Sequence, residues 1–172
     1  TTPGDARLLG IEGAEHMWQI GIWEQNEGLA ERVAELTPQG SALVRACRHP
    51  ALLAGLKLDL LVVSPGATGW AGAPALSCHT ALLPGGLSAL SRALPAETVV
   101  SYGSASRNTL TLSSLEERRA SVAVQREFIA LDGRAVERQE LVLPYDGTAP
   151  DLFLVLAGTA LLLGRIPGGT DG

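Results

Sequence analysis

The chain has 172 residues, 46 % of them hydrophobic and 18 % charged, which is enough apolar material for a sizeable core and excludes a disordered chain. Its 13 Lys and Arg against 18 Asp and Glu leave a formal net charge of -5, which argues against a basic surface that tracks nucleic-acid phosphates. The length fits a single α/β domain over residues 1–172, and we expect no nucleic-acid partner.

The cysteines and the longest apolar stretch indicate the cellular compartment in which the protein is expected. Cys47 closes one apolar run and Cys78 opens another, so we interpret both as reduced core thiols rather than as a disulfide or a metal pair. The longest uncharged apolar stretch, Leu152–Gly164, has 13 residues, whereas a membrane-spanning helix needs about twenty. No segment resembles a signal peptide. We therefore expect a cytoplasmic protein with no membrane partner and no metal site.

The first part of the chain predicts a strand followed by a helix. Arg7–Ile11 is an apolar run that leads into Gly13, which is typical of a strand end. Gly21 and Gly28 interrupt the helical segment that follows, each at a cost of about 1 kcal/mol relative to Ala, so we expect this helix in two pieces. The apolar stripe of this predicted helix has helical spacing and consists of Trp18, Ile22, Leu29, Val33 and Leu36.

The middle of the chain alternates short apolar runs with helix signals. The predicted strands are Ser41–Cys47, Leu58–Val63, Cys78–Leu83 and Glu97–Tyr102, and the predicted helices are Pro50–Lys57 and Leu87–Leu94. Residues 64 to 76 predict a loop because they contain three Gly and two Pro. Three strands stop at turn-forming residues, namely Ser64-Pro65-Gly66, Pro84-Gly85-Gly86 and Ser101-Tyr102-Gly103. Continuous apolar runs that end in this way are typical of a parallel sheet covered on both faces.

After Gly103 the pattern changes to alternation of apolar and polar residues. Thr109–Leu112 and Val122–Val124 show it, and it indicates strands with one wet face. The apolar stretch Leu152–Gly164 predicts a helix buried against the sheet. The predicted fold class is therefore α/β, with a mainly parallel sheet flanked by helices, an antiparallel hairpin and a buried C-terminal helix.

The hairpin is predicted from Asp132-Gly133, which lies between two strand-like segments. A type I′ turn needs a positive φ at both central positions, and Asp-Gly is one of the pairs that supply it. With that turn the strands would pair in a register that sets two favourable pairs of side chains face to face, Ile129 with Val136 and Glu127 with Arg138.

The carboxyl ends of parallel strands lie along one edge of a sheet, where ligands of open α/β sheets bind. Backbone N–H groups, hydroxyls and guanidinium groups at these ends predict a site for a small anionic ligand or for a protein partner. Neither G-x-x-x-x-G-K-[ST] nor G-x-G-x-x-G occurs in the chain, so no motif specifies a cofactor. The predicted ligand-binding residues are Arg48, Ser64, Gly66, Gly85, Gly86, Ser101, Gly103 and Arg107.

Two histidines at strand ends raise the alternative of a small enzyme. His16 and His49 each follow a predicted strand, so either imidazole is a candidate general base at this edge. The other interpretation of each is a helix cap or a surface side chain. His79 begins a run, so we expect it at the opposite edge. The residues that would orient a substrate, and with the histidines make up the candidate catalytic set, are Ser64, Ser101 and Tyr102.

Residues 98–166 run through a strand, alternating strands, a turn and a small-residue helix, marked by Thr98-Val99-Val100-Ser101-Tyr102-Gly103, Leu141-Val142-Leu143-Pro144, Gly147 and Ala157–Gly164. This order resembles the distal half of the central domain of Mur ligases, which form peptidoglycan amide bonds with ATP. Two parts of the family pattern are missing, the phosphate loop and a His-Asn pair, in whose place stand Thr148 and Ala149. The resemblance therefore implies a relative that keeps the architecture without the chemistry.

Three hypotheses about function follow, each from a different class. The first is a non-catalytic domain that binds a small anionic ligand or a protein partner at the carboxyl edge. The second is a small enzyme with His16 or His49 as its general base. The third is a structural subunit that forms a homo-oligomer through the apolar stripe of the first helix, with Trp18 and Trp23 at the interface.

Overall fold

The computed structural model describes residues 17–67 and 76–165. They form an eight-stranded sheet in the order β10-β7-β6-β5-β4-β3-β1-β2 and a two-stranded ladder of β8 and β9, which confirms the α/β class. The strands are β1 (Trp18–Trp23), β2 (Ala42–Cys47), β3 (Lys57–Val63), β4 (Ser77–Pro84), β5 (Thr98–Tyr102), β6 (Leu110–Leu115), β7 (Arg119–Val124), β8 (Phe128–Ile129), β9 (Ala135–Val136) and β10 (Gln139–Pro144). His16, the predicted strand Arg7–Ile11 and most of the predicted loop 64 to 76 lie outside the described residues. The single domain over residues 1–172 stays a prediction.

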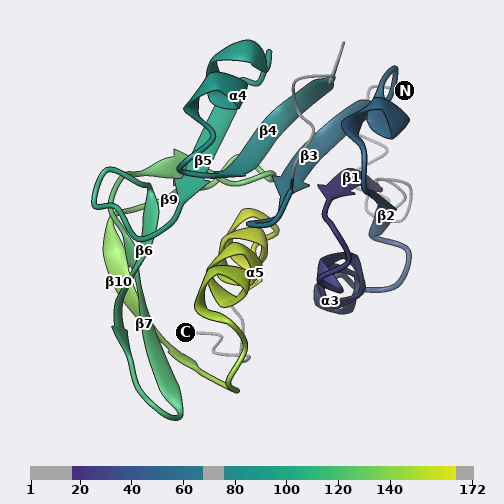
Figure 1. Ribbon diagram of the computed structural model, residues 1–172. Coiled ribbons are helices and arrows are strands. Elements are labelled where there is room, and N and C mark those ends of the chain that lie inside the picture. Colours follow the sequence, from purple (N-terminus) through teal and green to yellow (C-terminus); the bar gives the residue numbers. More distant parts are fainter. Residues whose placement is uncertain (1–16, 68–75, 166–172) are drawn as a thin grey trace, which may run out of the picture.

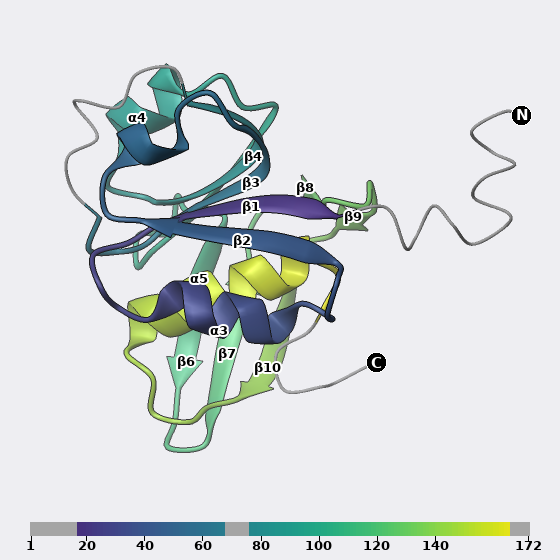
Figure 2. The same ribbon diagram turned by 90° about the vertical axis from the view of Figure 1, so that its right-hand side faces the viewer.

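Helices cover both faces of the sheet. They are α3 (Leu29–Leu36), α4 (Ser88–Ala93), α5 (Pro150–Leu162) and the 3-10 helix η1 (Pro50–Leu53). Helices α3 and α5 contact each other on one face, and α4 lies on the other (Figure 1, Figure 2). The predicted helix Pro50–Lys57 is shorter than expected because Gly55, with a φ of +83°, cannot continue a right-handed helix.

The segment Trp18–Trp23 is a strand, so the helix predicted over it is wrong. Strand β1 lies inside the sheet, where it pairs in parallel with β2 on one side and with β3 on the other. Its Trp and Ile side chains favour a strand, and Gly21 leaves room for a neighbour, because a Cβ there would lie 2.8 Å from Leu58 Cδ1. Helix α3 begins only after Gly28, whose φ is +75°. The expected break near the glycines exists, but a strand precedes it.

The strand order reverses at β1. The chain passes from β1 through α3 to β2 on one side, and then through η1 to β3 on the other side of β1. The carboxyl ends of β1 and β3 therefore meet at a topological switch point, the usual position of a ligand in an open α/β sheet. Strands β4 and β5 continue the parallel order, so their carboxyl ends lie along the same edge.

The other half of the sheet is antiparallel. Strand β7 lies between β6 and β10 and is antiparallel to both, which confirms the predicted alternating strands. These three strands bend away from β3 and β4, so that the sheet curls around α5 (Figure 1). Residues 153–162 of α5 are buried, as predicted for this segment. Within the described residues, no helix has the length and apolar character needed to cross a membrane.

The hairpin around Asp132-Gly133 is confirmed, but its predicted register is wrong. Of the two turn residues only Gly133 has a positive φ, at +93°, and its N–H donates to Ala130 O at 2.9 Å. This is a three-residue loop, a type I turn followed by a left-handed glycine, and it shifts the pairing by one residue relative to a type I′ turn. The expected pairs are absent from the ladder, which consists of Phe128 with Val136 and Ile129 with Ala135.

Candidate functional site

A glutamate fills the switch point between β1 and β3. Glu27 lies in the loop from β1 to α3, and its Oε2 accepts hydrogen bonds from Ser64 Oγ at 2.9 Å and from Gly66 N at 3.1 Å. Its Oε1 accepts the N–H of Gln25 at 2.6 Å. A Cβ on Gly66 would lie 2.5 Å from Glu27 Oε2, so a larger residue there would displace this carboxylate. A carboxylate with three donors thus stands where an external anion would bind.

A second glutamate binds the N–H groups at the N-terminus of α3. Glu24 is only 7 % exposed, and its two carboxylate oxygens accept the N–H groups of Leu29 at 2.8 Å and of Ala30 at 2.9 Å. The first N–H groups of a helix have no partner within the helix, and the helix dipole favours a negative charge beside them. Such a terminus would otherwise be a ready anion site.

These contacts give two predicted ligand-binding residues an internal role. The side chain of Ser64 is fully buried, and both its hydroxyl and the N–H of Gly66 donate to Glu27. Groups that are already bound inside the protein gain little from an external ligand, since the internal bond must first be broken. The switch point of this sheet is therefore closed by the chain itself.

A cleft of about 340 Å³ opens beside the closed switch point, at the ends of β3, β4 and β5. We call it the glycine cleft. Asp151, in the first turn of α5, and Tyr102 lie on its wall. Four of the predicted ligand-binding residues also line it, namely Gly85, Gly86, Gly103 and Arg107.

The position of the Asn108 side chain accounts for the presence of glycine at two of these positions. Asn108 is 3 % exposed, and its side chain lies between Gly85 and Gly103. A Cβ on Gly85 would lie 2.0 Å from Asn108 Oδ1, and one on Gly103 would lie 2.8 Å from Nδ2. A Cβ on Gly86, by contrast, would meet nothing within 4 Å. The two glycines make room for an amide of this chain, which itself lines the cleft.

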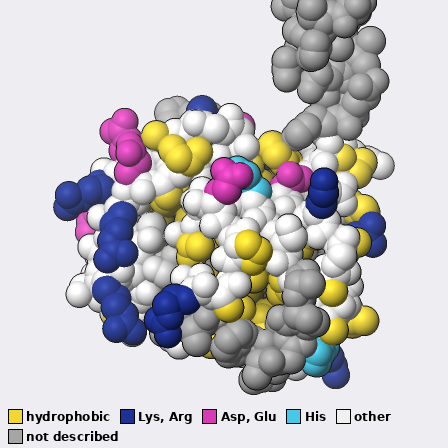
Figure 3. Space-filling view, turned by 90° about the horizontal axis from the view of Figure 1, so that it is seen from above, with side chains coloured by type: hydrophobic (Ala, Val, Ile, Leu, Met, Phe, Trp, Pro, Cys, Tyr) yellow, Lys and Arg dark blue, Asp and Glu magenta, His cyan; other side chains and the backbone are white. Residues whose placement is uncertain are grey.

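A second cleft of about 250 Å³ adjoins the first, between α4 and β5, and we call it the arginine cleft. Arg107 and Asn108 line both clefts, whereas Arg126, Ser91 and Ser101 line the second. Arg107 and Arg126 form no ion pair within residues 17–67 and 76–165. In the view from above, Lys and Arg side chains gather along the left border, the side on which β6, β7 and β10 lie in Figure 1 (Figure 3).

Comparison with known proteins finds a solved structure with a similar fold. Neither a protein-family model nor a curated protein matches the chain. The crystal structure of MurF from Acinetobacter baumannii is similar, with a TM-score of 0.50 and 9 % sequence identity over 91 % of this chain and 44 % of that chain. The likeness is one of fold alone. This chain spans less than half the length of that MurF.

The MurF likeness is broader than the resemblance found in residues 98–166. A match over 91 % of the chain includes much of its parallel half as well. Within this fold the loop from β1 to α3 reads Glu24-Gln25-Asn26-Glu27-Gly28 and contains neither Lys nor a hydroxyl side chain. This loop thus carries two glutamates and no phosphate-loop motif.

The candidate catalytic residues do not come together in one site. His49 is exposed, and its Nδ1 accepts the N–H of Ala51 at 3.2 Å as the cap of η1, one of the two roles considered for it. His49 follows β2 and Ser101 belongs to β5, and three strands separate these two, which sets them about 19 Å apart across the sheet. Ser101 Oγ accepts the N–H of Thr109 at 3.1 Å. His49 therefore cannot act as general base for Ser101 in this structure.

The hydroxyl of Tyr102 has a structural role. It is 1 % exposed and donates to Val63 O at 2.5 Å, which ties the end of β5 to the end of β3. Burial, with smaller contributions from the charges of Asp151 and Glu27, raises the pKa of this phenol far above its usual range. Such a group does not exchange a proton near neutral pH. His79, as expected, lies at the amino end of β4, on the opposite edge of the sheet.

Arg48 lies apart from both clefts. It lines a hollow of about 470 Å³ beyond β1 and β2, together with Glu24, Glu31 and Cys47. Cys47 and Cys78 are free cysteines and both are buried, which confirms their predicted positions in the core. Burial raises the pKa of Cys47 and raises that of Cys78 to about 11, so both thiols keep their protons at neutral pH.

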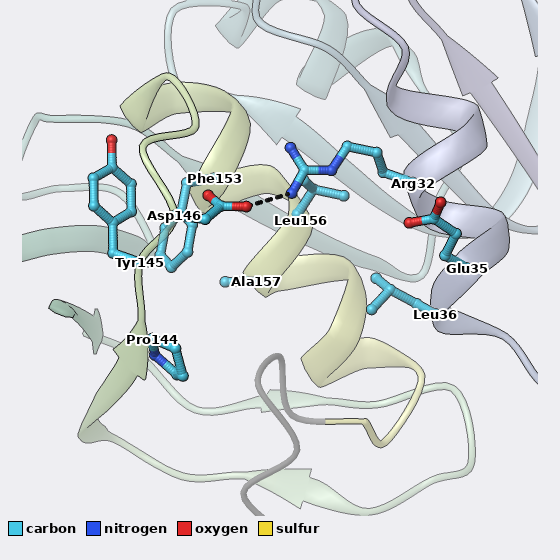
Figure 4. A pocket seen from close by; sticks show the side chains of 9 residues that line it. All are labelled: Arg32, Glu35, Leu36, Pro144, Tyr145, Asp146, Phe153, Leu156 and Ala157. Atoms are coloured by element: carbon cyan, nitrogen blue, oxygen red, sulfur yellow. Dashed lines mark hydrogen bonds and ion pairs between the residues drawn. The ribbon is translucent and has the colours of Figure 1, made fainter. Parts of the chain in front are cut away.

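A further cleft of about 310 Å³ lies between α3 and α5 (Figure 4). The guanidinium of Arg32 points across it to Asp146, at 3.4 Å, and donates to Thr148 Oγ1 at 3.0 Å. Hydrogen bonds from Thr148, and then the charge of Arg32, lower the pKa of Asp146. Because its arginine already has a carboxylate partner, this cleft is a weaker candidate for an anion than the arginine cleft.

The predicted oligomer interface is not formed as expected. Trp18 and Trp23 belong to β1 rather than to a helix, and the side chain of Trp23 is fully buried in the core. A fully buried side chain is unavailable to a partner. The homo-oligomer stays a prediction, but without this surface.

Sequence reasoning missed five residues of this edge, which are Glu24, Glu27, Asn108, Arg126 and Asp151. The first two follow a segment whose apolar spacing predicts a helix, so the end of β1 is not visible in the sequence. An available signal was the pair of acids just before Gly28, since acids favour the start of a helix. Asn108 and Arg126 join the edge only through the order of the strands.

Proposed function

We propose that this chain is a non-catalytic α/β domain that binds a small anionic ligand at the glycine and arginine clefts. The observation that carries the proposal is Arg107, which lines both clefts and has no carboxylate partner among the described residues. A guanidinium is always charged, and its planar fork matches a carboxylate or a phosphate. Two buried, reduced thiols favour the cytoplasm as the location.

The contacts of Glu24 and Glu27 support binding without catalysis. Together they take four backbone N–H groups and one hydroxyl at the switch point and at the N-terminus of α3. The resemblance to Mur ligases implies an architecture inherited from ATP-dependent enzymes, and these internal carboxylates would repel the phosphates of a nucleotide at this point. The cap role of His49 and the buried hydroxyl of Tyr102 support the same conclusion.

Thermal unfolding in the presence of anions tests the proposal. Inorganic phosphate, citrate and sulfate are titrated at constant ionic strength against the wild type and the variant Arg107→Gln. A ligand at a hundred times its Kd stabilises a protein by about 2.7 kcal/mol. For a chain of this size we expect a rise in Tm of roughly 5–10 °C with at least one anion. The variant should lose most of that rise.

Arg45→Gln is the matched control, because Arg45 is an exposed arginine of β2 that forms no ion pair among the described residues. This control removes the same charge far from the clefts and should keep the full rise in Tm. The proposal is wrong if no anion stabilises the wild type, as expected for a domain that recognises only a protein partner. It is equally wrong if Arg107→Gln responds as the wild type does.

A further inference from the structure

We infer that the ligand is a phosphate monoester of a hydroxylated small molecule, with its phosphate held by Arg107 and Arg126 and its hydroxyl groups against Asp151. The inference rests on the proposed anion binding and adds the chemical class and the orientation of the ligand. Positive side chains line one of the two adjoining clefts and a carboxylate lines the other, and this separation of charge supports the inference.

Positive and negative groups are segregated along this edge. Arg126 lines the arginine cleft, Asp151 lines the glycine cleft, and Arg107 lies where the clefts adjoin. An anion in the glycine cleft would meet the carboxylate of Asp151, whereas one in the arginine cleft would meet two guanidinium groups. Since neither arginine has an ion-pair partner in the described part of the chain, the anionic end belongs in the arginine cleft.

The two arginines are held together by hydrogen bonds between their chain segments. Gln125, next to Arg126, donates from Nε2 to Ser106 O at 3.1 Å, and Ser106 is next to Arg107. The N–H of Gln125 also donates to Thr109 O at 2.7 Å. The chain on either side of Arg107 is thus tied to the chain that carries Arg126. A site that is formed before binding loses less conformational entropy when the ligand arrives.

The donors of the arginine cleft match a phosphate monoester. Such a group carries about 1.5 to 2 negative charges near neutral pH and three acceptor oxygens, and two guanidinium groups balance that charge. Ser101 accepts the N–H of Thr109, and no described acceptor takes its own hydroxyl proton, so that proton is available to a phosphate oxygen. Ser91 adds a second hydroxyl to the same wall.

The glycine cleft receives the uncharged remainder of the ligand. Asp151 is exposed at the start of α5 and forms no ion pair within the described ranges. An ionised carboxylate only accepts hydrogen bonds, so it favours a neighbour that carries hydroxyl donors. Open space around Gly86 leaves room for such a group beside it.

Isothermal titration calorimetry with four probes tests the inference. The probes are inorganic phosphate, propyl phosphate, glycerol 3-phosphate and glucose 6-phosphate. They are measured on the wild type and on the variants Arg107→Gln, Arg126→Gln, Asp151→Ala and Arg45→Gln. We expect glycerol 3-phosphate or glucose 6-phosphate to bind at least tenfold more tightly than propyl phosphate, which lacks hydroxyl groups. Arg126→Gln should weaken all four probes about tenfold. Asp151→Ala should remove only the preference for hydroxyl groups.

The outcomes separate this inference from the proposed function. If inorganic phosphate binds and Arg107→Gln abolishes its binding, but hydroxyl groups give no preference, the inference fails while the anion site stands. If Arg126→Gln leaves phosphate binding unchanged, the assignment of the phosphate end is wrong. If no probe binds, the inference fails, and the proposed function fails with it only if citrate and sulfate also leave the Tm unchanged. Unchanged Tm values without ligand confirm that each variant is folded, and Arg45→Gln again serves as the matched control.

Discussion

At the scale of single residues, several polar side chains at the carboxyl edge bind other parts of the same chain. Glu27 binds Ser64 and Gly66, and Asn108 lies between Gly85 and Gly103. The glycines at these positions are therefore required by the packing of neighbouring side chains, which is a different reason from the close approach of a ligand. Arg107 and Arg126 remain without such partners within the described ranges, so their guanidinium groups are available to a ligand.

The adjacent residues Gly85 and Gly86 offer a matched test of this packing. Gly85→Ala puts a Cβ 2.0 Å from Asn108 Oδ1, so the amide must leave its position, and we expect a loss of about 1–3 kcal/mol in the free energy of unfolding. Gly86→Ala meets no atom within 4 Å and should change stability by less than about 1 kcal/mol, in the stabilising direction. Urea denaturation of both variants measures the difference. Equal effects would contradict the account of Asn108.

At the scale of elements, the end of α5 and the hairpin of β8 and β9 are joined. The helix ends in a left-handed glycine, Gly164, with a φ of +75°. The N–H of Gly164 donates to Leu161 O at 3.2 Å and that of Arg165 to Ala160 O at 2.6 Å, a Schellman arrangement. Leu131, in the hairpin loop, donates its N–H to Leu162 O at 2.9 Å. One loop thus completes the carbonyl bonding of the helix end.

Substitution of Gly164 tests this joint. Gly164→Ala forces a side chain into the left-handed region and sets its Cβ 2.7 Å from Arg134 Nη2, so we expect a loss of about 1–2 kcal/mol. Gly164→Asn should lose less, because Asn tolerates that backbone conformation better than Ala does. Thermal or urea unfolding of the two variants checks the order. An alanine variant as stable as the wild type would exclude the proposed role of the glycine.

At the scale of the whole molecule, the sheet curls around α5 and separates two apolar cores. One core contains α3 and α5, and the other contains Leu53 of η1 and Leu90 of α4. Because α5 is covered by the curled sheet on one side and by α3 on another, it has little polar surface left. Its single buried hydroxyl, on Thr159, donates back to Val155 O at 2.8 Å.

Hydrogen exchange should show this arrangement directly. We expect the central amides of α5, residues 155 to 160, to exchange only through global unfolding, with an opening free energy equal to that of the whole molecule, roughly 5–15 kcal/mol. The six residues of α4, on the other face of the sheet, form a short helix that should open locally at a lower free energy. Mass-spectrometric measurement under native conditions compares the two. Equal rates for α4 and α5 would contradict the picture of α5 as the centre of the core.

The fold class, most of the strands and helices and the edge that holds the clefts are predictable from the sequence, because burial on one or both faces leaves a local pattern of apolar residues. Three features are visible only in the folded chain: Trp18–Trp23 is a strand, the hairpin register differs by one residue, and Glu27 closes the switch point. Those outcomes depend on partners far along the chain, 37 residues for Ser64 and 39 for Gly66. Local periodicity carries no information about such partners.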